Sequence, residues 1–152
     1  MKQKPSLKAR ALRFLATREH SARELAAKLR PYVEDGDDLD EVMAWLQEKG
    51  FLSEERFAEA FARRKSSRYG SRRILYELQD HHLAGAVIQE ITETLKETEL
   101  QRAFTLWERK FGKPPETLPE KAKQIRFLQQ RGFPGNIIRQ VIKGDLPDFE
   151  DD

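Results

Sequence analysis

Apolar residues recur at spacings of three and four residues along nearly the whole chain. The first stripe contains Leu7, Ala11, Phe14 and Leu15, which share one face of a helix. No segment alternates apolar and polar residues with period two, and no Asn-Gly or Asp-Gly turn joins two apolar runs. The spacing therefore predicts an all-α protein with nine short amphipathic helices in a row.

Residues that start and stop helices divide this pattern into segments. Ser21 and Glu24 predict a capping box, in which each side chain accepts a free N–H group at the helix start. The stripes at 87–95 and 103–111 are predicted as two separate helices, the sixth and the seventh. Further caps are expected at Ser6 and Ser53, and further helix ends at Gly50, Gly112, Gly132 and Gly144.

Nine helices group most simply into three units of three helices. The units span residues 5–50, 51–96 and 97–144, and an acidic tail follows at 145–152. Hydrophobic residues make up 38% of the chain and charged residues 36%, so an elongated array with a thin core fits better than one thick globule. Units of this size are too small to be comfortably stable alone, so each is expected to stack against its neighbours.

Charge is segregated along the chain, although the net charge is only +2. Both signs gathered in blocks suit docking onto a partner that also presents both signs. Salt bridges between neighbouring blocks within the chain are the alternative explanation. The net charges by segment are +7 for 1–30, −8 for 31–62, +6 for 63–73, −5 for 74–100, +7 for 101–143 and −5 for 144–152.

The densest functional signal is the basic segment, residues 63–73, which holds six cations and no acid. Arginine forks suit phosphates and carboxylates, and the ring of Tyr69 could stack on such a partner. The partner anion is therefore nucleic acid or an acidic protein face, unless Glu54, Glu55, Glu59 and the acids of 34–41 neutralise the segment internally. The candidate binding residues are Arg63, Arg64, Lys65, Arg68, Tyr69, Arg72 and Arg73.

Catalytic and metal-binding patterns are poorly supported. The chain has no cysteine, no glycine-rich phosphate loop, no Gly-x-Ser-x-Gly turn and no His-Glu-x-x-His pair. His81 and His82 are adjacent, so on a helix they point to different sides and suit chelation badly, while His20 is expected to pack at a helix entry. We expect no enzyme activity, cofactor, metal site, signal peptide or membrane span, and a monomer in the cytoplasm.

Three stretches of the chain resemble the RecX family of bacterial regulatory proteins. Residues 50–61, GFLSEERFAEAF, continue to Gly70 and are similar to the central signature of that family. The first repeat of the family is similar to 11–29, and its last repeat is similar to 121–142. The family commonly places a glycine shortly after the position of Leu78, where this chain has His82 and Ala84 instead.

The resemblance implies an elongated, curved chain of tandem three-helix repeats that binds the RecA recombinase as a filament on DNA. It implies modulation of ATP hydrolysis and strand exchange, inhibitory in most family members, and hence a role in recombination, DNA repair and the SOS response. A direct DNA-binding regulator is the alternative, because 70–78 resembles a recognition helix that begins with Arg72 and Arg73. A helical scaffold for another acidic protein is a further alternative.

Overall fold

The computed structural model describes residues 4–149, and in that range every regular element is a helix. The protein is therefore all-α, as its periodicity predicts. The two short 3₁₀ turns are η1 (Arg30–Tyr32) and η2 (Gln79–His81). The α-helices are α1 (Leu7–Thr17), α2 (Ala22–Leu29), α3 (Leu39–Glu48), α4 (Glu54–Ser66), α5 (Ser71–Leu78), α6 (Gly85–Lys110), α7 (Leu118–Gln130) and α8 (Gly135–Lys143).

The long helix α6 corrects the prediction of separate sixth and seventh helices. It runs without a break over 26 residues and contains both predicted segments. No glycine or proline lies between its first residue and Lys110, so nothing in the sequence stops it. Its buried face repeats every fourth residue through Val87, Ile91, Leu95, Glu99, Ala103 and Trp107. The charged Glu99 interrupts the apolar stripe, although its spacing continues the buried face.

The chain builds three hydrophobic cores in series rather than one. The first core joins α1, α2 and α3 and extends to Leu52. The second core lies between α4, α5 and the amino-terminal half of α6. The third lies between the carboxyl-terminal half of α6, α7 and α8. These are three tandem three-helix repeats, and the second and third share α6.

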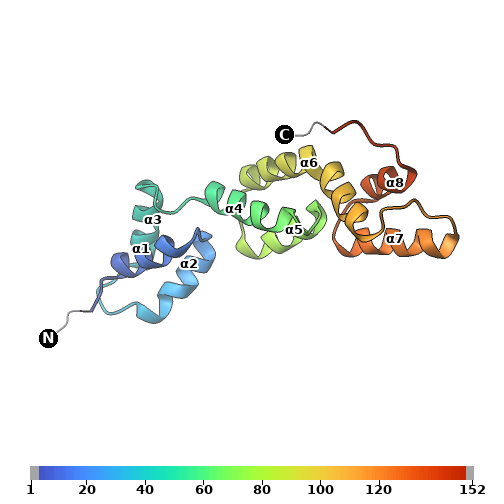
Figure 1. Cartoon of the computed structure of the whole chain (residues 1–152). Helices are drawn as coiled ribbons and strands as arrows, with labels where there is room; N and C mark the ends of the chain where they lie inside the picture. The colour runs from blue at the N-terminus through green and yellow to red at the C-terminus, as the bar shows by residue number, and fades with distance from the viewer. Residues whose placement is uncertain (1–3, 150–152) are drawn as a thin grey trace.

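The repeats are arranged as an elongated, curved array (Figure 1). Helices α1–α3 form one end, α4 and α5 with the start of α6 form the middle, and α7 and α8 pack near the other end of α6. Residues 145–149 follow α8 without forming a helix or strand, and the last three residues of the predicted acidic tail lie outside the described residues. None of the described helices is both long enough and apolar enough to cross a membrane.

Helix termini follow the predicted capping chemistry closely. The hydroxyl of Ser21 accepts the Glu24 N–H, and the Glu24 carboxylate accepts the Ser21 N–H. Ser6 and Ser53 also cap their helices through their hydroxyls. His82 is the only non-glycine residue with a positive φ in the described range, at 49°. It therefore adopts the left-handed conformation, which non-glycine residues take up only rarely.

Candidate binding surface

The basic segment spans the turn between α4 and α5. Arg63, Arg64 and Lys65 lie in the last turn of α4, where cations interact favourably with the partial negative charge at a helix carboxyl end. Arg72 and Arg73 lie in the first turn of α5, where that interaction is absent or unfavourable. The local fold therefore accounts for the cations of α4 better than for those of α5.

Tyr69 gathers three cations around its ring from two repeats. The guanidinium of Arg73 lies 4.0 Å from the ring centroid, and Lys65 Nζ lies 5.7 Å from it. Arg131, at the end of α7 in the third repeat, lies 5.8 Å from the same centroid. Cations within about 6 Å of an aromatic face are attracted by its quadrupole. We call these four residues the Tyr69 cluster.

Glu77 supplies the internal counter-charge for this cluster. Its carboxylate lies 3.6 Å from Lys65 Nζ and 3.6 Å from Arg73 Nε. Glu54 and Glu55, which the sequence offers as neutralising groups, instead accept hydrogen bonds from the Ala84 N–H and from the Ser53 hydroxyl. Ion pairs within the chain therefore neutralise two of the six cations of the basic segment. The acid that does so, Glu77, lies on α5 and not in the acidic block that precedes the basic segment.

The four remaining cations of the basic segment are solvent-exposed: Arg63, Arg64, Arg68 and Arg72. Within residues 4–149, none of them makes an ion pair. Arg63 lines a groove between α4 and α6 and is not part of the Tyr69 cluster. Arg64 lies over the Phe61 ring at 5.4 Å, whereas Arg63, Arg68 and Arg72 make neither an ion pair nor a cation–π contact within the described residues.

The amino end of α5 is closed by the third repeat. The Gly70 N–H donates to the Arg131 carbonyl at 2.7 Å, and the Arg72 N–H donates to the Gly132 carbonyl at 3.0 Å. The Ser71 N–H donates to the buried Glu99 carboxylate at 2.9 Å. A recognition helix presents its amino-terminal residues to a DNA groove. The first turn of α5 is instead engaged with the turn between α7 and α8.

A buried ion pair on α6, between Glu99 and Arg102, lies just behind this turn. Arg102 lies 3.4 Å from the Glu99 carboxylate and also donates to three carbonyls, those of Ser66, Tyr69 and Leu95, at 2.8–3.2 Å. Burial lowers the pKa of Arg102, and the Glu99 charge opposes that effect. Because the guanidinium is satisfied on several sides, Arg102 fixes the path of the basic segment.

The junction between the first and second repeats is built from histidines. His81 Nδ1 lies 2.7 Å from the hydroxyl of Ser21, and its ring packs 4.6 Å from that of Phe57. His82 contacts Arg23 of α2. The last residue of η2 and the residue that follows it therefore both contact the first repeat. The described residues contain no group of three or more His, Cys, Asp or Glu side chains able to hold a metal ion.

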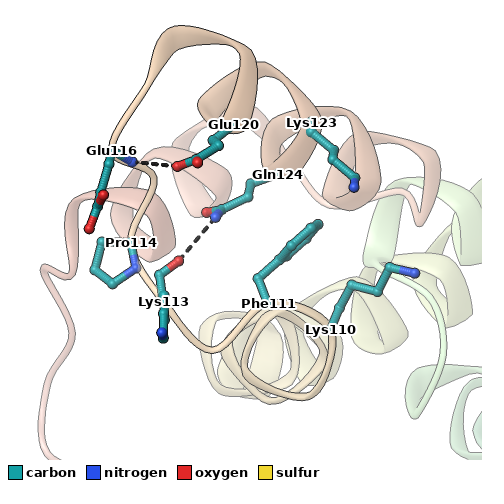
Figure 2. A pocket seen from close by; sticks show the side chains of 8 residues that line it. All are labelled: Lys110, Phe111, Lys113, Pro114, Glu116, Glu120, Lys123 and Gln124. Atoms are coloured by element: carbon teal, nitrogen blue, oxygen red, sulfur yellow. Dashed lines mark hydrogen bonds between the residues drawn. The ribbon is translucent and has the colours of Figure 1, made fainter.

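A shallow hollow lies between the end of α6, the following loop and α7 (Figure 2). Gln124 forms its floor, accepting the Trp107 indole N–H at 2.7 Å and donating to the Lys113 carbonyl at 3.0 Å. The Glu116 N–H donates to Glu120 at 2.8 Å across the loop. These bonds anchor the loop to the helices, so the buried Gln124 amide has a structural role.

Three residues that contact the basic segment from outside it were not predicted from the sequence: Glu77, Glu99 and Arg131. From the sequence, Glu77 and Glu99 contributed only to the net charge of 74–100, and Arg131 only to that of 101–143. The available signal was the four-residue spacing that places Glu99 on the buried side of α6. An acid on a buried stripe requires a partner, and Arg102 lies one turn away.

The fold and surface define an all-helical tandem-repeat protein with exposed arginines at its second repeat. Two family models match the chain: the second three-helix domain of RecX over residues 53–91 and the third over residues 97–142. Regulatory protein RecX of Herbaspirillum seropedicae is 47% identical over 146 residues, covering 96% of this chain and 95% of that protein. Regulatory protein RecX of Ralstonia nicotianae is 43% identical, covering 94% and 90%.

The crystal structure of RecX from Lactobacillus salivarius has the same fold. It matches with a TM-score of 0.77 and covers 91% of this chain and 93% of that chain, at 17% identity. At that identity the likeness concerns the fold, while the closer relatives define the family. The chain belongs to the RecX family of regulatory proteins.

Proposed function

We propose that this protein binds the RecA recombinase filament on DNA and inhibits its ATP hydrolysis and strand exchange. It acts in the cytoplasm as a monomer, by binding rather than by catalysis. The observation that carries the proposal is membership of the RecX family along almost the entire chain. The elongated repeats and the exposed arginines of the basic segment support it, since a filament offers a long, periodic and charged surface.

The proposed mechanism follows from rigidity and charge. A curved array lying across neighbouring filament subunits would hold them in one relative arrangement. Filament growth and ATP turnover require those subunits to move, so a bound array would slow both. Arg68 and Arg72 are exposed and unpaired within residues 4–149, so they can form charge-assisted hydrogen bonds to carboxylates or phosphates.

Direct DNA binding through α5 is less well supported by this geometry. The three N–H groups at the start of α5 already donate to Arg131, Gly132 and Glu99. They are therefore engaged at the end that a recognition helix presents to a groove. Any contact with DNA would use the exposed side chains alone and would fall steeply with salt.

The test is ATP hydrolysis by RecA filaments on single-stranded DNA as this protein is titrated in. We expect inhibition near stoichiometric amounts, and a flat response would contradict the proposal. The double variant Arg68→Glu/Arg72→Glu should weaken inhibition by about tenfold or more, because two exposed cations become repulsive. Lys121→Glu/Lys123→Glu is the matched control, with the same charge change on exposed residues of α7. Far-UV circular dichroism should show unchanged helicity for both.

A further inference from the structure

The outer side of α5 carries a strip of three exposed residues that the fold does not use. Arg72, Tyr76 and Asp80 follow at four-residue spacing along α5 and into η2, so a cation, an aromatic ring and an anion lie in order. Tyr76 is 71% exposed, the most exposed aromatic residue in the described range. This strip is beside the Tyr69 cluster, since Arg73 adjoins Arg72.

The ring of Tyr76 differs from those of the other two tyrosines. Tyr69 has Arg73 over its ring at 4.0 Å, and Tyr32 has Arg10 over its ring at 4.1 Å. Within residues 4–149, Tyr76 has neither a cation over its ring nor an aromatic neighbour. Most of this ring is left in water by the fold, so it offers a partner a large area to bury.

The charges beside the ring indicate what kind of partner it meets. Arg72 needs an anion opposite, whereas Asp80 needs a cation or a hydrogen-bond donor. A nucleic-acid backbone is uniformly anionic, so it would be repelled by the exposed Asp80 of η2. A protein surface with an acid and a base on either side of an apolar pocket satisfies all three residues.

We infer that Tyr76 is the central anchor of a protein-binding surface, with Arg72 and Asp80 fixing the orientation of the partner. This inference rests on the proposed function, and the partner is the protein face of the filament rather than its DNA. Tyrosine and arginine are the residues most enriched among those that dominate interface energies. Tyr76 supplies buried area, while the two charges select one direction of docking.

The test compares the affinity of full-length variants for RecA filaments and, separately, for free single-stranded DNA. Tyr76→Ala should weaken filament binding by about tenfold or more, whereas Tyr76→Phe should stay within about threefold of the parent. Leu118→Ala is the matched control, because Leu118 is 81% exposed but lies on α7. It should bind filaments as the parent does.

Asp80→Lys separates the two classes of partner by the sign of its effect. A protein surface with a cation opposite Asp80 predicts weaker filament binding and no gain on free DNA. Tighter binding to DNA and to filaments would overturn the inference in favour of nucleic acid. Parent-like binding by Tyr76→Ala would overturn the inference while leaving the proposed function intact. Absence of filament binding by the parent chain would overturn the proposed function itself, and the inference with it.

Discussion

Gly70 and Gly132 meet backbone to backbone at the junction of the second and third repeats. A Cβ atom on Gly70 would lie 2.5 Å from both the carbonyl carbon and the carbonyl oxygen of Gly132. A Cβ atom on Gly132 would in turn lie 2.5 Å from that of Arg73. The two glycines are therefore the point at which the turn between α7 and α8 fits against the start of α5.

Gly70→Ala is expected to destabilise the protein by about 2–4 kcal/mol, because the methyl group separates the two turns and breaks hydrogen bonds between them. Gly85→Ala is the matched control: its Cβ would meet nothing within 4 Å, and its φ lies outside the left-handed region. That substitution should be neutral or stabilise by up to about 1 kcal/mol. Urea unfolding of both variants measures the difference, and equal costs would contradict the close fit.

Glu99→Ala should destabilise the protein by about 3 kcal/mol or more, because it leaves Arg102 buried without its carboxylate and the Ser71 N–H without an acceptor. Glu97→Ala removes the same side chain from an exposed position of the same helix. It is expected to change the free energy of unfolding by less than about 0.5 kcal/mol. Similar effects of the two substitutions would show that the buried pair adds no stability.

His20 makes the stability of the first repeat depend on pH. Its ring is fully buried, with Lys28 Nζ 2.8 Å from Nε2 and the Arg18 carbonyl 3.0 Å from Nδ1. Because an ammonium group only donates, Nε2 must accept, so the neutral ring carries its proton on Nδ1. Burial lowers the pKa of His20, and the charges of Arg18 and Lys28 add to that effect, although the hydrogen bond to the Arg18 carbonyl opposes it.

The direction in which stability changes with pH follows from the lowered pKa of His20. The unfolded chain binds a proton below about pH 6.5, whereas the folded chain resists protonation until lower pH. The stabilisation is therefore complete above about pH 6.5 and is lost as the pH falls through the folded-state pKa. His20→Gln removes this titration while His81 and His82 remain. The stability difference between parent and variant should shrink on acidification, and parallel curves would contradict the assignment.

Trp107 and Gln124 are expected to be energetically coupled. Gln124→Met leaves the buried indole N–H of Trp107 without its acceptor and should cost about 1–3 kcal/mol. Once Trp107→Phe has removed that N–H, the same change at Gln124 should cost less. A double-mutant cycle on the free energy of unfolding measures the coupling. Strict additivity would show that the hydrogen bond contributes nothing.

Local chemistry made most of the fold predictable from the sequence. The helix caps at Ser6, Ser21 and Ser53 depend only on the backbone N–H three residues further on, and each cap is present as expected. The sequence WLQEKGF at 45–51 is similar to FLQQRGF at 127–133, and this similarity also has a local cause. Helices α3 and α7 each end two residues before a glycine with positive φ, Gly50 and Gly132. A shared helix ending explains this resemblance without requiring the two segments to occupy the same place in a repeat.

The organisation of the surface was less predictable, because it depends on contacts between distant parts of the chain. Tyr69 was expected to stack on a partner, yet its ring is already occupied by Arg73 and by Arg131, which is 62 positions away in the sequence. No buried role was predicted for Glu99, which contributed only to the net charge of residues 74–100. Only the fold places Arg102 and the start of α5 beside it.

Helix α6 has a mechanical consequence for the whole molecule. At about 1.5 Å per residue its 26 residues form a continuous strut of about 39 Å that belongs to two repeats at once. Neither repeat can be excised without cutting this strut, and neither can swivel against the other while it stays intact. By contrast, α3 ends at Glu48 and α4 begins at Glu54, so the first repeat is joined to the second through a loop and side-chain contacts rather than through a shared helix.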